Sequence, residues 1–121
     1  MPLPITALLT SALAASLTLV VGETRPVDGL AARVTFVGVA ADSRCPAGTT
    51  CVWEGDAAVD IRLQPDEGPA HLVRLHTSGR EPREAVAAGL RVVLDRLDPY
   101  PDATAPIAPD EYRLVLSITA Q

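Results

Sequence analysis

Lysine is absent from this chain, and aromatic residues are few. Ten arginines carry all the positive side-chain charge against fifteen acidic residues, which gives a formal net charge of −5. Contacts with nucleic-acid phosphates need a basic face, so this balance argues against a nucleic-acid-binding protein. Aromatic residues make up only 3% of the chain and hydrophobic residues 48%. We therefore expect an aliphatic core and exclude a disordered chain.

Cysteine is nearly absent as well, since Cys45 and Cys51 are the only two. Two thiols are too few for a small protein framed by several disulfides, or for a closed structural zinc site. In an oxidising compartment the two can pair and persist, and the five residues between them include Pro46 and Gly48. A disulfide across so short a loop stabilises the folded chain by roughly 2–2.5 kcal/mol on the chain-entropy model.

Charged side chains are also missing from residues 1–22, and the first one in the chain is Glu23. A short apolar run ends there in the Ala-Leu-Ala sequence of residues 12–14, a pattern typical of a signal-peptidase site. We therefore predict a signal peptide over 1–14 and one domain over 15–121, with no membrane span in the mature chain and a secreted, periplasmic or cell-envelope location. The basic residue that usually opens a signal is missing, so either the signal is atypical or translation starts upstream of Met1. A buried N-terminal element of a cytosolic protein and an uncleaved membrane anchor stay open as alternatives.

From residue 17 onward, apolar residues recur mostly at every second position, and turn residues interrupt the pattern at intervals. Such alternation is typical of antiparallel strands with one face packed and one face in solvent. Strands are predicted over 17–22, 30–40, 57–64, 71–77, 90–97 and 111–119, with a further short one over 51–54. The segment 82–89 is compatible with one helical turn.

The fold class that these strands predict is all-β, an antiparallel two-sheet sandwich with Ig-like, Greek-key connections and six or seven strands. The stretch 98–110 holds four prolines, which makes it too stiff for a hairpin. We expect this stretch to cross from one sheet to the other.

The least generic part of the chain surrounds the cysteines. It reads D-S-R-C-P over 42–46 and C-V-W-E-G over 51–55. This segment resembles one found in uncharacterised small exported bacterial β-sandwich proteins that carry a D-S-R-C-P…C-x-W-x-G motif. The sequences L-D-P-Y-P over 97–101 and Y-R-L over 112–114 resemble the same group. The resemblance implies a secreted or envelope β-sandwich and no particular activity; members are often predicted to be lipoproteins, whereas this chain lacks the cysteine that a lipid anchor needs.

Four residues of this segment are candidates for a binding loop: Asp42, Arg44, Trp53 and Glu54. Arginine and tryptophan dominate binding hot spots, and a disulfide-braced loop is a rigid place for them. Structural alternatives stand beside this hypothesis. Trp53 can pack against the disulfide or cap one end of the core, and Arg44 can form a local ion pair with Asp42.

Catalytic, cofactor-binding and metal-ligating patterns do not stand out. His71 and His76 are five positions apart in a predicted strand, so their side chains point to opposite faces and cannot easily ligate one ion together. The cysteines have C-x5-C spacing rather than the C-x-x-C of thiol oxidoreductases, and no G-x-S-x-G marks a nucleophilic serine. We therefore predict a protein that is not an enzyme and that uses no cofactor.

The sequence thus predicts a small, monomeric, exported β-sandwich protein, a non-enzymatic binding or structural module of the cell envelope with an unidentified protein or carbohydrate partner. Two alternatives remain open. One is a metal-handling or thiol-redox protein that uses Cys45, Cys51 and the histidines. The other is a protease-inhibitor-like module that presents Arg44 and its neighbours on the disulfide-braced loop.

Overall fold

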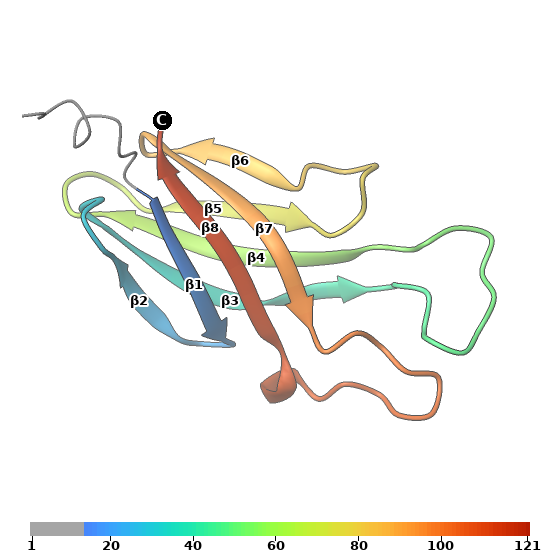
Figure 1. Cartoon of the computed structure of the whole chain (residues 1–121). Helices are drawn as coiled ribbons and strands as arrows, with labels where there is room; N and C mark the ends of the chain where they lie inside the picture. Colours follow the sequence, from blue (N-terminus) through green and yellow to red (C-terminus); the bar gives the residue numbers. More distant parts are fainter. Residues whose placement is uncertain (1–13) are drawn as a thin grey trace, which may run out of the picture.

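Two antiparallel sheets lie face to face in the computed structural model, which describes residues 14–121 (Figure 1). In this part of the chain the first sheet has the strand order β1 (Ala14–Val20), β8 (Arg113–Ala120), β7 (Leu90–Asp98) and β6 (Glu84–Ala87). The second sheet has the order β2 (Thr24–Val27), β3 (Ala32–Asp42), β4 (Ala57–Pro65) and β5 (His71–His76). The predicted two-sheet sandwich is confirmed, with eight strands in the described residues rather than six or seven.

The predicted signal peptide falls on 1–14, and all but its last residue lie outside the described residues. Ala14, at the predicted cleavage site, is the first residue of β1 and pairs with Thr119 of β8. One turn of 3-10 helix, η1 (Pro109–Glu111), lies just before β8. No helix in the described part of the chain is long and apolar enough to cross a membrane.

Alternation along each strand builds the core between the sheets. In β4, Val59, Ile61 and Leu63 are fully buried, whereas the residues between them point outwards. Phe36, on β3, is the only fully buried aromatic residue in 14–121, and the other large side chains that are fully buried are Val, Leu and Ile. The aliphatic core that the composition predicts is therefore confirmed.

The sequence pattern predicts neither β2 nor β6. β2 is four residues long and contains Pro26, which a strand tolerates only at a sheet edge. The helical turn considered for 82–89 is wrong, because β6 pairs with β7 in this segment. The alanine-rich segment forms a ladder of backbone hydrogen bonds with β7 instead of a helix. The short strand over 51–54 is also wrong, because these residues form the outer part of a loop.

The proline-rich stretch does not cross between sheets, so the predicted Greek-key crossing at 98–110 is wrong. The strands that it joins, β7 and β8, pair with each other in one sheet. A long loop, unlike a tight hairpin turn, tolerates several prolines between paired strands. The sheets are connected instead by 21–23, between β1 and β2, and by 77–83, between β5 and β6. Consecutive strands thus follow one another around the sandwich.

This connectivity gathers three long connections at one end of the sandwich, on the right of Figure 1. They are the disulfide loop (43–56, between β3 and β4), the β5–β6 loop (77–83) and the proline-rich loop (99–112, between β7 and β8). We call these three segments together the loop end. The two cysteines and the four candidate binding-loop residues all lie in the loop end or at the last residue of β3.

Removing the Phe36 side chain is expected to destabilise the core strongly. Phe36→Ala leaves a cavity between the sheets and should lower the free energy of unfolding by about 3–5 kcal/mol. The matched control is Val86→Ala on β6, where the side chain is 58% exposed, and its effect should stay within about 0.5 kcal/mol. Urea denaturation of both variants measures the difference. Equal effects would contradict the described core.

Candidate functional site

The disulfide loop continues the pairing of β3 and β4 beyond the two strands. The Ser43 amide donates to the carbonyl of Asp56 (2.7 Å), and the Cys45 amide donates to the carbonyl of Glu54 (2.8 Å). Gly55 lies between these two rungs with φ +75°, and a Cβ there would lie 2.0 Å from the carbonyl oxygen of Ser43. Because the opposite backbone approaches so closely, only glycine fits at this position.

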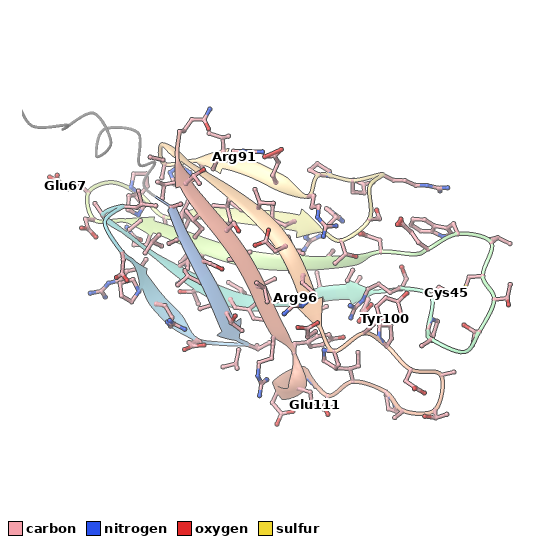
Figure 2. The ribbon with its side chains drawn as sticks, in the orientation of Figure 1. Cys45, Glu67, Arg91, Arg96, Tyr100 and Glu111 are labelled. Carbon is pink, nitrogen blue, oxygen red and sulfur yellow. A yellow bond between two sulfur atoms is a disulfide. The ribbon has the colours of Figure 1, made fainter. Side chains whose placement is uncertain are left out.

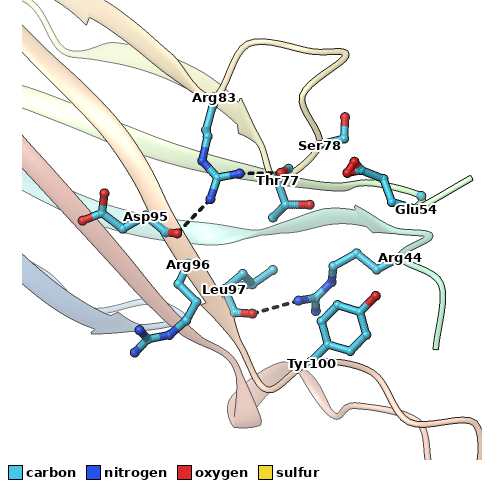
Figure 3. Close-up of a pocket in the computed structure, with 10 residues that line it drawn as sticks. Arg44, Glu54, Thr77, Ser78, Arg83, Asp95, Arg96, Leu97 and Tyr100 are labelled. Atoms are coloured by element: carbon cyan, nitrogen blue, oxygen red, sulfur yellow. Dashed lines mark hydrogen bonds between the residues drawn. The ribbon is translucent and has the colours of Figure 1, made fainter. Parts of the chain in front are cut away.

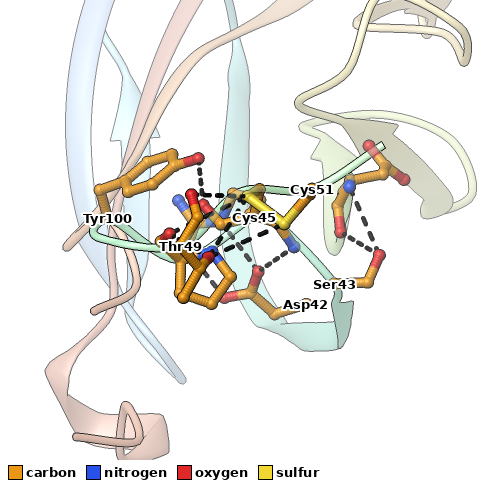
Figure 4. Close-up of a disulfide and its surroundings, with 9 residues drawn as sticks. Asp42, Ser43, Cys45, Thr49, Cys51 and Tyr100 are labelled. Atoms are coloured by element: carbon orange, nitrogen blue, oxygen red, sulfur yellow. Dashed lines mark hydrogen bonds and ion pairs between the residues drawn. A yellow bond between two sulfur atoms is a disulfide. The ribbon is translucent and has the colours of Figure 1, made fainter. Parts of the chain in front are cut away.

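Cys45 and Cys51 form the disulfide that the sequence predicts, with their Cα atoms 6.0 Å apart (Figure 4). Thr49 folds the loop inside it, since its hydroxyl (2.7 Å) and its amide (3.2 Å) both donate to the carbonyl of Pro46. Both sulfur atoms are engaged in the bond, so neither cysteine offers a thiolate to a metal or a substrate while the disulfide is intact.

Arg44 is the centre of the loop end, and its side chain is turned inwards. The residue is only 7% exposed. Its Nε and Nη2 donate to the two carboxylate oxygens of Asp42, each at 2.8 Å, in a bidentate ion pair. Nη1 donates to the carbonyl of Leu97 (2.8 Å) and Nη2 also to the carbonyl of Pro99 (3.1 Å). Arg44 therefore fastens the end of β3 in one sheet to the end of β7 in the other.

Tyr112 completes the ion pair by donating its hydroxyl to Oδ2 of Asp42 (2.9 Å). Burial by itself would raise the pKa of Asp42, but the hydrogen bonds from Arg44 and Tyr112 and the charge of Arg44 outweigh it, and the pKa lies below its usual value. Burial, together with the Asp42 carboxylate, raises the pKa of Tyr112 to about 12. Asp42 is thus held as a carboxylate and Tyr112 as a neutral donor.

The proline-rich loop docks on the disulfide loop through Tyr100. The Tyr100 hydroxyl donates to the carbonyl of Cys45 (2.6 Å), as Figure 4 shows. Its ring lies under the guanidinium of Arg44, with 5.4 Å from Cζ to the ring centroid. The Ala47 amide adds a hydrogen bond to the carbonyl of Pro101 (2.9 Å). The two loops therefore form one continuous body.

In the structure, three segments that are separate motifs in the sequence come together. The segment 42–46 supplies the ion pair, 97–101 supplies two carbonyls and the Tyr100 ring, and 112–114 supplies the Tyr112 hydroxyl. Sequence reasoning did not place the last two segments in the site. The expectation that these two segments belong with the first to one set of motifs was the available signal.

A second polar cluster joins the disulfide loop to the β5–β6 loop through Asp56. Its Oδ2 lies 2.6 Å from Nδ1 of His76, and its Oδ1 accepts the amides of Thr77 (3.1 Å) and Ser78 (3.0 Å). Burial would raise the pKa of Asp56, but the hydrogen bonds from His76 and Ser78 outweigh it and lower the pKa. Asp56 therefore caps the turn that follows β5.

Trp53 and Val52 lie at the outer part of the disulfide loop, away from this interior network. Trp53 is 36% exposed and Val52 fully exposed. The guanidinium of Arg80 lies 4.5 Å from the centroid of the indole ring, a stacking contact between two loops. Trp53 thus supports the surface of the loop end, and its partner there is Arg80.

Glu54 and Arg44 line a cavity of about 230 Å³ at the open end between the sheets (Figure 3). Opposite them, Arg83 donates to the carbonyls of Thr77 and Asp95. A second hollow, of about 530 Å³, lies between the disulfide loop and the proline-rich loop, with Asp42, Arg44 and Tyr112 in its wall. Of the four candidate binding residues, Asp42 and Arg44 are therefore engaged in the interior, and Trp53 and Glu54 face outwards.

The histidines do not come together with the cysteines. His71 and His76 lie at opposite ends of β5, and His76 is bound to Asp56. Within the described residues, no three His, Cys, Asp or Glu side chains are close enough to hold a metal ion. Side chains are shown over the whole sandwich in Figure 2.

Comparisons with known proteins give no further guide to the site. No protein-family model, no curated protein and no solved structure matches the chain. The chemistry of the loop end therefore rests on its own geometry.

Replacing Arg44 is expected to be strongly destabilising because it leaves the Asp42 carboxylate buried without its partner. Arg44→Met should lower the free energy of unfolding by about 3–5 kcal/mol. Arg62→Met is the matched control: Arg62 is exposed on β4, and its loss should change stability by about 0.5 kcal/mol or less. Guanidinium denaturation compares the two. A small effect at Arg44 would show that the interior network does not hold the loop end.

Stability is expected to depend on pH through Asp42. A carboxyl whose pKa is lowered by folding contributes stability above its unfolded pKa, about 3.9, and loses that contribution as the pH falls through the folded value. The gap in unfolding free energy between the wild-type chain and Asp42→Asn should therefore be widest near neutral pH and shrink below about pH 4. Denaturation curves between pH 7 and 2 measure it; a gap that stays constant would contradict the lowered pKa.

Proposed function

We propose that the protein is an exported, non-enzymatic, monomeric binding module that presents the outer part of the disulfide loop to a macromolecular partner. One observation carries this proposal: a projecting loop, uncharged from Cys45 to Trp53, is held rigidly from below by the Arg44 network. Two of its side chains, Val52 and Trp53, are apolar and exposed. An apolar segment on a rigid base is what a binding surface needs.

Export is supported by the disulfide. Cys51 is exposed, so the reducing pool of a cytoplasm would have access to the bond. An oxidising compartment preserves it. The predicted signal peptide over 1–14 points the same way.

Rigidity supports binding because it removes an entropic cost. A loop that is already ordered loses little conformational freedom when a partner arrives. The disulfide, the Tyr100 contact with Cys45 and the Ala47 contact with Pro101 each restrict the same nine-residue stretch. Arg44 contributes to this base and, with 7% exposure, is not available as a contact residue. A protease-inhibitor-like role that presents the Arg44 side chain therefore finds no support in this geometry.

A non-enzymatic role is supported by how the polar groups are used. The side chains in the loop end or next to it that most resemble catalytic groups are those of Asp42, Arg44, Asp56, His76 and Tyr112. Each is engaged in a hydrogen bond that joins two segments of the chain. These bonds stabilise the fold.

Site-specific photo-crosslinking in the native host tests the proposal. A photoreactive amino acid at position 52 should give a discrete adduct, whereas the same group at position 86, also exposed but on β6, should give none. Because Val52 makes no buried contact, the substitution should leave stability within about 0.5 kcal/mol. Equal labelling at both positions, or no adduct at 52 with the protein at its native level, would contradict a binding role for the disulfide loop.

A further inference from the structure

The first part of the disulfide loop, residues 43–47, is held by hydrogen bonds that do not involve sulfur. The Cys45 amide donates to the carbonyl of Glu54, and its carbonyl accepts the hydroxyl of Tyr100. The Ala47 amide donates to a carbonyl of the proline-rich loop. We call residues 43–47 the inner arm. Its position is fixed by contacts that remain when the disulfide is broken.

Residues 50–53, which we call the outer arm, are held differently. Within the part of the chain that the structure describes, none of their amides or carbonyls forms a hydrogen bond with another backbone group. Cys51 is joined to Cys45 by the disulfide, and the indole of Trp53 stacks on Arg80. All four residues of the outer arm are exposed. Its order therefore depends on the disulfide and on one stacking contact.

The sulfur atom of Cys51 is the more accessible of the two. Cys51 is exposed, whereas Cys45 is half-buried. Around Sγ of Cys45 lie the carbonyl oxygens of Pro46 (3.9 Å) and Thr49 (3.8 Å) and the hydroxyl of Thr49 (3.5 Å). Sγ of Cys51 has one polar contact of this kind among the described residues, with the Thr49 hydroxyl at 3.8 Å. A thiolate from solution therefore reaches Cys51 more easily than Cys45.

We propose that the disulfide is a redox switch, which orders the outer arm when it is formed and releases it when a dithiol protein with a C-x-x-C site reduces it. A thiolate of the reductant attacks Sγ of Cys51, the bond to Cys45 breaks, and Cys45 leaves as a thiolate that takes up a proton. The second thiol of the reductant displaces Cys51 as a thiol and closes the reductant's own disulfide. Two electrons and two protons thus pass to the loop.

This inference rests on the proposed function, because the outer arm carries the exposed side chains of Val52 and Trp53. After reduction, the inner arm and the ion pair of Arg44 stay in place, and the outer arm moves freely. A partner then has to order the outer arm again, and this loss of conformational entropy lowers the affinity by about tenfold or more. The oxidised chain is the binding form.

Fluorescence of Trp53, the only tryptophan in the chain, measures the release of the outer arm without any partner. The variant Cys45→Ser/Cys51→Ser cannot form the disulfide, so its indole should leave Arg80 and be quenched by acrylamide about twofold more strongly than in the oxidised chain. The Ala47 amide is the internal control, and its hydrogen exchange should stay within about threefold of the wild-type rate. Equal quenching of the two forms, or much faster exchange at Ala47, would contradict a local switch.

The rate of reduction by thioredoxin under native conditions separates a switch from a structural disulfide that is reached only on global unfolding. The core variant Ile61→Val/Ile118→Val loses stability in both sheets, since both side chains are fully buried. Direct attack on the folded loop predicts a rate within about twofold of the wild-type rate. Reduction through global unfolding predicts an increase of about fivefold or more, and this result would overturn the proposal.

Crosslinking at position 52 in the native host then distinguishes this inference from the proposed function. The adduct should be at least about fivefold weaker in the Cys45→Ser/Cys51→Ser variant than in the oxidised chain. Equal adducts in the two forms would contradict the switch and leave the binding role standing. No adduct in either form would contradict the binding role, and with it the regulation that rests on it.

Discussion

The burial of one guanidinium group sets the arrangement of the loop end. Arg44 is removed from solvent, and a buried cation is tolerated only where acceptors surround it. Asp42 provides the counter-charge, and the carbonyls of Leu97 and Pro99 accept the remaining hydrogen bonds. These acceptors belong to opposite sheets, so satisfying the arginine fixes the distance between the end of β3 and the end of β7. With the ends of β3 and β7 fixed in this way, the disulfide and Tyr100 stabilise the loops that follow them.

The ion pair of Arg44 and Asp42 contributes more to the specificity of the loop arrangement than to the net stability of the fold. The desolvation of two charges offsets much of their attraction, so an apolar replacement of the whole pair could be equally stable. An apolar contact, however, does not select among nearby positions of the proline-rich loop. The forked guanidinium group of Arg44 does select one position of this loop, because its donors match one set of acceptors. The loop end is therefore defined in shape, and the exposed side chains at Val52 and Trp53 have fixed positions relative to the sandwich.

Regular alternation made the long strands predictable. β8 follows the period of two throughout and β4 follows it from Val59 to Leu63, since one face of each packs on the core. β2 and β6 escaped prediction because four residues contain too little pattern, and their partners β3 and β7 decide their conformation. The disulfide followed from the two cysteines. The ion pair of Arg44 with Asp42 was one of the alternatives that the sequence offered, and the structure confirms it. The link from Arg44 to the other sheet was not predicted, because two of its acceptors are backbone carbonyls more than fifty positions away, which side-chain chemistry does not reveal. Trp53 was a candidate binding residue, with packing against the disulfide or the core as the structural alternative, and its stacking contact with Arg80 in another loop was not predicted.

Amide hydrogen exchange in the conservative variant Arg44→Lys tests the central role of this arginine most directly. Lysine keeps the charge but cannot form the fork. If the fork holds the two loops together, the Ala47 amide, which donates to Pro101, should exchange about tenfold faster or more in the variant. The Leu30 amide, which donates to Val27 at the opposite end of the sandwich, should keep its wild-type rate. Unchanged exchange at Ala47, or equal acceleration at both amides, would contradict the account.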